Sequence, residues 1–461
     1  MGSEWTEKPL AACMDAIIDY RGKTPTKTDS GIPLITAKII KDGAIQPITE
    51  FIAEDSYDTW MRRGLPEAGD VVLTTEAPLG EVAQLDGRKV ALAQRVITLR
   101  GKKGILDNTY LKYLMQSQYV QHQLDGRGTG TTVKGIKQSE LRQIKLKFPS
   151  FDQQKGIANI LGTLDNKIEL NCQINTTLEA MAQALFKSWF VDFDPVIDNA
   201  LVAGNPIPDE VAARAERRAQ ATQQPSSEQP HTLPANIRQQ FPDRFVLTEE
   251  MGWVPEGWKV STIGAEVETT GGGTPSTKDD SFWKDGTHPF CTPKDMSRLT
   301  SWVLMDTERY LTDAGVKKVS SGQLPIETVL MSSRAPIGYL AISDIPVSVN
   351  QGIIAMLPNP AFGPLYLLNW AKFNMPAIID RANGSTFLEI SKKNFQPIPF
   401  IVPHKTILQS FNAEARTIHA KILKLSEQID SLTILRDALL PKLLSGQLRI
   451  PEAEQLLAEA L

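Results

Sequence analysis

Apolar residues between positions 151 and 190 recur at alternating steps of four and three, which is the spacing of a heptad seam. No proline interrupts the stretch after Pro149, so the pattern predicts one helix, roughly 60 Å long and too long for a compact domain. Asn171 and Asn175 fill the remaining seam positions, and polar residues there favour one specific partner. The apolar seam residues are Ile157, Leu161, Leu164, Ile168, Leu178, Ala182 and Leu185.

The partner helix is predicted in the same chain, because the pattern repeats 254 residues later. The repeat continues upstream of both helices, with small slips. VVLTTEAPLG (71–80) matches TVLMSSRAPIG (328–338), and ALAQRVI (91–97) matches SVNQGII (348–354). The chain is therefore a tandem duplication of a domain followed by a helix, with a period far too long for a solenoid. The second seam consists of Phe411, Ile418, Ile422, Leu425, Leu432 and Leu439.

Strand-like and helix-like stretches both occur within a repeat, which predicts a mixed α/β fold. VVLTT (71–75), KVALAQRVITLR (89–100) and RQIKLKF (142–148) have the apolar and β-branched content of strands. DNTYLKYLMQSQYVQHQL (107–124) is predicted to form one amphipathic helix. The expected organisation is an α/β domain at 1–150, a long helix at 151–194, a connector at 195–253, a second α/β domain at 254–402, a second long helix at 403–446 and a tail at 447–461.

Two details refine this organisation. Within the connector, VAARAERRAQ (211–220) predicts a short exposed helix, whereas QQPSSEQP (223–230) is expected to stay flexible. Pro441 lies inside the second long helix and is expected to kink or end it.

Composition indicates an ordinary globular protein, with 461 residues, 41% hydrophobic and 22% charged. The chain lacks an apolar run long enough to span a bilayer and lacks a signal-peptide pattern, so we expect a cytoplasmic protein with no membrane partner. Cys13, Cys172 and Cys291 are far apart and form no CxxC motif. We therefore expect buried or half-buried free thiols and no metal site.

A local basic patch stands out against the formal net charge of −4. Residues 100–147 contain ten Lys or Arg residues and three Asp or Glu residues. Within them, DGRGTGTTVKGIK (125–137) combines glycines, which allow close backbone approach, with side chains that can meet phosphates or base edges. A solvated basic face is the alternative interpretation of this patch.

Catalytic motifs are missing or incomplete. GKT at 22–24 resembles the end of a Walker A loop, but Ile17 stands where that motif needs glycine. GxGxxG and GxSxG patterns are also absent, and no pair of carboxylates recurs in both repeats as an acid and a base. We therefore expect no catalytic residues, and the chain resembles a reader without a reaction of its own.

Taken together, these stretches resemble the specificity subunit of type I restriction-modification systems, from Trp5 to about Ile450. Any one motif would be weak, but their order along two repeats makes the match strong. The stretches that carry it include GKTPTKTDSGIPLITAKII (22–40), SWFVDFDPV (188–196), GWVPEGWKV (252–260), VLMSSRAPIGYLAI (329–342) and LRDALLPKLLSGQLRI (435–450).

The resemblance implies two target recognition domains, each reading half of a bipartite asymmetric site in double-stranded DNA. The two long helices would form an antiparallel coiled coil with pseudo-two-fold symmetry, which sets the gap between the half-sites. The implied partners are two methyltransferase subunits and the restriction subunits, which carry the motor and nuclease. S-adenosylmethionine, ATP and Mg²⁺ would be bound by these partners in phage defence and DNA methylation. A noncatalytic scaffold, or a reader in another phage-defence assembly, is the alternative.

Candidate DNA-binding residues lie in the two equivalent loops. Arginine and asparagine can pair with guanine and adenine edges, whereas lysine and threonine more often hold phosphates. Alternatively, the Gly, Ser and Thr residues only close a turn, and the different loops reflect divergence after duplication. Lys38 and Lys294 are secondary candidates, and Arg334 and Gln351 are weaker ones. The main candidates are Arg127, Thr129, Thr131, Thr132, Lys134 and Lys137, with Arg381, Asn383, Ser385, Thr386, Lys392 and Lys393 as their second-domain counterparts.

Overall fold

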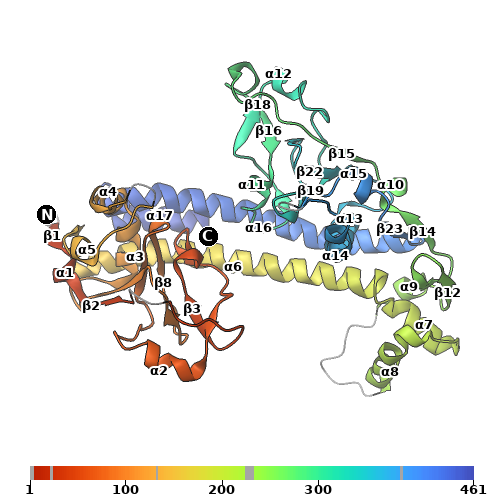
Figure 1. Ribbon diagram of the computed structural model, residues 1–461, viewed down its shortest axis with the longest axis horizontal. Helices are drawn as coiled ribbons and strands as arrows, with labels where there is room; N and C mark the ends of the chain where they lie inside the picture. The colour runs from red at the N-terminus through yellow and green to blue at the C-terminus, as the bar shows by residue number, and fades with distance from the viewer. Residues whose placement is uncertain (1–4, 21–23, 131–132, 224–232, 385–387) are drawn as a thin grey trace. The chain divides into compact units, whose positions relative to one another are not determined.

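A computed structural model describes residues 5–20, 24–130, 133–223, 233–384 and 388–461. The chain divides into two compact units (Figure 1). Unit 1 comprises Met1–Glu169 and Asp430–Leu461, and unit 2 comprises Leu170–Ile429. Each unit therefore contains one α/β domain and a segment of each long helix, which is the duplicated α/β architecture expected from the sequence.

In unit 1 the main sheet is antiparallel and has the strand order β2-β10-β7-β8. All five residues of the interior strand β7 are buried, which explains its unbroken apolar and β-branched sequence. A smaller sheet has the order β6-β3-β9, β1 pairs with β11, and β4 pairs with β5. The strands are β1 (Thr6–Pro9), β2 (Met14–Asp19), β3 (Ile32–Ile35), β4 (Ile40–Lys41), β5 (Ala44–Ile45), β6 (Phe51–Ile52), β7 (Val71–Thr75), β8 (Leu79–Gln84), β9 (Ala91–Leu92), β10 (Val96–Gly101) and β11 (Lys145–Phe148).

The helices of unit 1 correct one expectation. The stretch predicted as one helix forms two, because Ser117 has an extended backbone and its hydroxyl accepts a hydrogen bond from the Val120 N–H, which caps the second helix. The elements are α1 (Leu10–Cys13), η1 (Ala37–Ile39), η2 (Glu54–Ser56), α2 (Tyr57–Trp60), α3 (Asn108–Gln116), α4 (Gln118–Arg127), α5 (Gln138–Leu141) and α17 (Ile450–Ala460).

Unit 2 repeats the strand order of unit 1: its main sheet is β15-β22-β19-β20 with β17 added at the β20 edge, and its smaller sheet is β18-β16-β21. In addition, β14 pairs with β23, and β12 with β13. The β7–β8 and β19–β20 hairpins both turn through a cis Ala–Pro bond, at Pro78 and Pro336. The strands are β12 (Phe245–Thr248), β13 (Gly252–Pro255), β14 (Lys259–Thr262), β15 (Thr269–Gly271), β16 (His288–Cys291), β17 (Val303–Leu304), β18 (Arg309–Leu311), β19 (Val329–Ser333), β20 (Ile337–Ser343), β21 (Ser348–Val349), β22 (Ile353–Met356) and β23 (Pro399–Val402).

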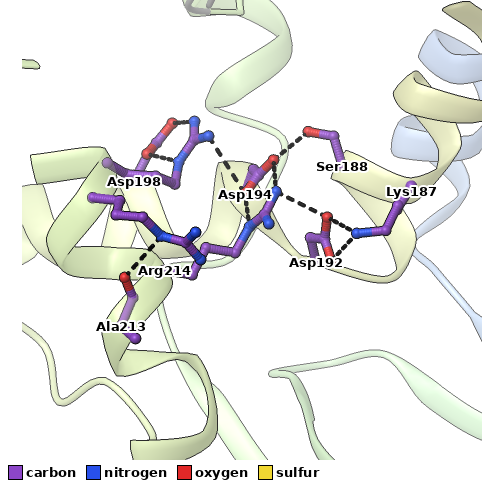
Figure 2. A network of polar contacts seen from close by, with 9 residues as sticks. Lys187, Ser188, Asp192, Asp194, Asp198, Ala213 and Arg214 are labelled. Carbon is purple, nitrogen blue, oxygen red and sulfur yellow. Dashed lines mark hydrogen bonds and ion pairs between the residues drawn. The ribbon is translucent and has the colours of Figure 1, made fainter. Parts of the chain in front are cut away.

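The connector contains ordered helices. Asp194 at the start of α7 accepts a hydrogen bond from Arg214 of α8 at 2.6 Å, and Asp198 accepts one from Arg218 at 2.6 Å (Figure 2). The predicted short helix is therefore longer than expected and fastened to α7, while 224–232 lies outside the described residues. The helices of unit 2 are α7 (Asp194–Ala203), α8 (Asp209–Gln223), α9 (Ala235–Arg238), α10 (Ile263–Glu266), η3 (Asp280–Phe282), α11 (Pro293–Met296), α12 (Asp313–Val316), α13 (Pro364–Phe373), α14 (Met375–Asp380) and α15 (Lys392–Phe395).

The predicted long helices are α6 (Phe151–Phe190) and α16 (Lys405–Ser445), coloured yellow and blue in Figure 1. In unit 2, Asn171 donates to Gln428 at 2.9 Å and Asn175 donates to Ser426 at 3.2 Å, so the two segments run antiparallel. Helix α16 continues through Pro441 to Ser445, so the proline does not end it.

The predicted seam lies in the hydrophobic cores of the two units. Both seam asparagines are fully buried, as their seam positions require. Leu425 is half-buried, and Ile168, Leu178, Leu185 and Ile418 are partly buried against the cores. The remaining predicted seam residues are buried: Ile157, Leu161, Leu164, Ala182, Phe411, Ile422, Leu432 and Leu439.

Candidate nucleic-acid interface

In unit 1 the predicted loop is held against the tip of the β7–β8 hairpin. Thr129 and Gly135 exchange two backbone hydrogen bonds, at 2.8 and 2.9 Å. The next residue, Ile136, donates its N–H to the carbonyl of Thr75 at 2.9 Å, and its side chain is buried. The loop is therefore a short ribbon that extends the sheet, which places its polar side chains beside the hairpin tip.

The equivalent loop of unit 2 has the same backbone frame. Asn383 and Glu389 exchange two backbone hydrogen bonds, at 2.9 and 2.8 Å, and the Ile390 N–H donates to Ser333 at 3.0 Å. Since these residues correspond to Thr129, Gly135, Ile136 and Thr75, the duplication preserved the frame while changing the side chains on it.

The described candidates of unit 1 lie on this ribbon or next to it in the chain. Arg127, the last residue of α4, donates to Glu140 at 3.0 Å. Lys134 donates to Asp125 at 2.9 Å, and this contact lowers the pKa of the Asp125 carboxyl. Thr129 and Lys137 are exposed, whereas Thr131 and Thr132 lie outside the described residues. Two of the basic side chains are thus oriented by carboxylates.

The described candidates of unit 2 are exposed. Arg381 and Asn383 flank the start of the loop, and the Arg381 carbonyl accepts a hydrogen bond from the Asn394 side chain at 3.0 Å. Lys392 and Lys393 open α15 and face solvent. Ser385 and Thr386 lie outside the described residues.

The secondary candidates lie on short helices. Lys38 is exposed on η1, and Lys294 is exposed on α11. Lys294 and Arg298 both contact the Glu308 carboxylate, at 2.8 Å each, so this pair of cations is partly neutralised.

Several polar residues beside the unit 1 loop were not among the predicted candidates. Arg95 Nε lies 2.6 Å from Glu76 Oε1, and Gln94 donates to the Thr24 hydroxyl at 2.9 Å. Glu76, Gln94 and Arg95 line a hollow of about 320 Å³ that the loop also lines. A signal existed in the sequence, because the glutamine recurs in the matched segments ALAQRVI and SVNQGII.

Unit 2 brings the weaker candidates together at the equivalent place. The Arg334 guanidinium lies 3.8 Å from the Glu389 carboxylate, and Gln351 accepts a hydrogen bond from the Thr274 hydroxyl at 2.7 Å. Arg334 also forms an isolated backbone bridge with Glu389, which fixes the hairpin tip to the loop.

Other classes of site find no support in the described part of the chain. There, no group of three His, Cys, Asp or Glu side chains could hold a metal ion, and no helix has the length and apolarity needed to cross a membrane. Cys13 and Cys291 are buried and Cys172 is half-buried, all as free thiols. Burial raises the pKa of the Cys13 and Cys291 thiols, which makes them poor nucleophiles.

Comparison with known proteins shows the family of the chain. A family model described as the type I restriction modification DNA specificity domain matches residues 16–180 and 255–433. The chain is 31% identical to the type I restriction enzyme HindI specificity subunit of Haemophilus influenzae over 328 residues, 66% of this chain and 69% of that one. It is 23% identical to the MjaIX specificity subunit of Methanocaldococcus jannaschii over 396 residues, 83% and 78% of the two chains. The solved type I restriction-modification S subunit from M. genitalium shares the fold, with a TM-score of 0.51, 15% identity and 96% of each chain covered.

Proposed function

Because this chain belongs to the type I restriction modification DNA specificity family, we propose that it is the DNA-reading subunit of a type I restriction-modification complex. One observation carries the proposal: each unit presents an equivalent ribbon beside an equivalent hairpin tip, and the polar side chains on the two ribbons differ. Two such frames suit two different half-sites of one asymmetric DNA sequence. Each unit would read one half-site.

The loop side chains have the chemistry that this role needs. Arg127, Arg381 and Asn383 can pair with base edges, while Lys134, Lys137, Lys392 and Lys393 can hold phosphates. Contacts to the DNA backbone are also proposed for Lys38, Lys294, Thr129 and the four hydroxyl residues outside the described ranges. Such contacts would make the affinity fall steeply as salt rises.

The long helices would set the gap between the half-sites and present their exposed faces to methyltransferase subunits. Leu170, Ile174 and Met181 of α6 and Ile434 of α16 are exposed apolar side chains on these helices. Restriction subunits would complete the complex. Methyl transfer from S-adenosylmethionine and ATP- and Mg²⁺-dependent cleavage would belong to those partners, so this chain would be noncatalytic and would act in the cytoplasm.

The deciding experiment is co-expression of this chain with its cognate methyltransferase subunit in a host that lacks such systems, followed by mapping of N6-methyladenine in the genome. We expect a bipartite motif with a fixed gap, lost when this chain is omitted. An assembled, active methyltransferase complex without any motif would instead favour a noncatalytic scaffold.

A second experiment tests the role of the helices. Four residues inserted after Leu170, with four matched residues after Ile429 of the antiparallel helix, would add about 6 Å to each helix. We expect a longer gap between unchanged half-sites. Finding the original gap in a complex that still methylates would refute this part of the proposal. An insertion of four residues in the connector, after Gly204, is the matched control.

A further inference from the structure

An arginine and a glutamate lie next to each other at the hairpin tip of both units, but different elements supply them in the two units. In unit 1 the hairpin tip carries Glu76, and the arginine comes from the turn between β9 and β10. In unit 2 the tip carries Arg334, and the glutamate, Glu389, comes from the loop. The two units therefore share an arginine–glutamate pair at this place in the fold, although the two residues stand at different positions of the aligned repeats.

The Arg334 side chain reaches the turn that, in the other unit, supplies the arginine. Gly352 is the counterpart of Arg95 in the matched segments. A β-carbon built on Gly352 would lie 3.2 Å from Arg334 Nε, so the Arg334 side chain lies over the point where the Arg95 side chain begins. A side chain at 352 would therefore make the Arg334 guanidinium shift by a few tenths of an ångström.

The backbone of Arg95 adopts a conformation that is uncommon for a residue with a side chain. Its φ of 74° lies in the left-handed region, which residues with a β-carbon rarely adopt and which glycine adopts readily. Backbone strain of this kind concentrates at functional sites. Half of the Arg95 side chain remains exposed, despite its contact with Glu76.

Each arginine has the same polar neighbour. Gln94 precedes Arg95 and is hydrogen-bonded to Thr24, while Gln351 precedes Gly352 and is hydrogen-bonded to Thr274. In each unit a hydrogen-bonded glutamine and threonine therefore lie beside an arginine that has a carboxylate within 4 Å, a surface suited to planar hydrogen-bonding groups. The fork of an arginine matches the O6 and N7 acceptors of guanine in the major groove. It also matches two phosphate oxygens, so the experiment has to distinguish base contact from phosphate contact.

We infer that Arg95 in unit 1 and Arg334 in unit 2 each read one guanine in the half-site of their unit, oriented by Glu76 and Glu389 respectively. This inference rests on the proposed function and makes it more specific. It also assigns different roles to two sets of residues: the loop lysines contact the DNA phosphates, and Arg95 and Arg334 select a base.

The test compares methylation motifs of complexes that contain the wild-type chain, Arg95→Lys, Arg95→Gly or Arg334→Lys, each co-expressed with the methyltransferase subunit. Lysine keeps the positive charge but lacks the planar guanidinium group that can pair with two acceptors at once. With either Arg95 variant we expect one guanine of one half-site to become degenerate, with methylation of the other bases at that position rising at least about tenfold relative to guanine. Arg334→Lys should reduce the specificity for guanine at one position of the other half-site.

Two comparisons guard against a folding artefact, one of them with a further variant. Arg95→Gly relieves the left-handed backbone, so its melting temperature should equal or exceed that of the wild type. Arg88→Lys, which changes an exposed arginine paired with Asp86 in the same unit, should leave the motif unchanged.

Three results would overturn the inference: a wild-type half-site without guanine, unchanged motifs in all Arg95 and Arg334 variants, or a uniform loss of methylation with no position relaxed, which would indicate phosphate contact. Absence of any bipartite motif from the wild-type complex would instead refute the proposed function itself. The two failures are therefore distinguishable.

Discussion

Asp165 in unit 1 and His419 in unit 2 occupy equivalent positions of the repeat, and each fastens an α/β domain to a long helix in a different way. Asp165 accepts hydrogen bonds from Lys112 and Tyr113, both at 2.6 Å, and from Arg436 at 3.1 Å. His419 accepts one from the indole N–H of Trp302 at 3.1 Å. The same task is thus performed by an ionic cluster in one unit and by a neutral pair in the other.

The surroundings explain why the two solutions differ. Unit 2 packs Phe186, Phe190 and Phe411 in contact around Tyr366, so its helix segments already share a large apolar surface. The polar contact at His419 therefore only needs to position Trp302. In unit 1, burial alone would raise the pKa of Asp165, but Lys112, Tyr113 and Arg436 together lower it, which keeps the carboxylate charged.

Removing the aromatic anchor should have the largest effect. Trp302 is 4% exposed, and Trp302→Ala is expected to destabilise unit 2 by about 3–5 kcal/mol, because it leaves a cavity beside α16. Hydrogen exchange of peptides from the middle of α16 measures this loss. Trp302→Phe retains most of the volume and should lose much less. Equal protection in Trp302→Ala and the wild type would show that the anchor is dispensable.

Breaking the ionic anchor should have the second largest effect. Asp165→Asn leaves Lys112 and Arg436 without their shared charge in a partly buried site, at an expected cost of about 2–3 kcal/mol in unit 1. Urea denaturation, monitored by hydrogen exchange of peptides from α3, measures this cost. Asp437→Asn is the matched control, because that exposed carboxylate also contacts Arg436 and should cost about 0.5 kcal/mol or less. Similar costs for the two variants would contradict an anchoring role for Asp165.

The two anchors should also respond differently to pH. Burial lowers the pKa of His419, opposed by Asp344 and Glu327, so its stabilising contribution is complete above its ordinary pKa of about 6.5 and is lost as the pH falls below it. Protonation removes the lone pair that accepts the Trp302 N–H. The contribution of Asp165, with its lowered pKa, persists until about pH 3.9 and is lost below it. Between pH 7 and 5, protection against exchange, relative to the intrinsic rate at each pH, should therefore fall around Trp302 and not around Tyr113. His419→Gln should abolish that difference.

The sequence predicted the helices that carry these anchors but not the anchors themselves. A heptad seam is visible because its residues lie on one face of one element, and all of the predicted seam residues are at least half-buried. Tyr113–Asp165 and Trp302–His419 join residues 52 and 117 positions apart, which no local periodicity encodes.

The candidate site shows the same limit. Aligning the repeats places Arg95 opposite Gly352 and Glu76 opposite Arg334, which looks like plain divergence. Only the fold shows that one arginine–glutamate pair has moved between neighbouring elements. Ser117 likewise divides an amphipathic stretch whose apolar pattern continues across it, because a cap depends on a single hydroxyl rather than on periodicity.

The variant with the smallest predicted effect tests the contact between Trp302 and His419. Glu179 accepts the Trp302 backbone N–H at 2.8 Å, and burial raises its pKa, opposed by that hydrogen bond and by Lys372. A raised carboxyl pKa means that stability falls as the pH rises from about 4.3 through the folded value, the reverse of the His419 dependence. Glu179→Gln keeps an acceptor without a charge, so at pH 7.5 we expect equal stability or a gain of at most about 1 kcal/mol. Because this variant removes the opposing titration, the loss of protection around Trp302 between pH 7 and 5 should become steeper. A shallower loss would mean that Glu179, and not His419, governs the pH response of unit 2.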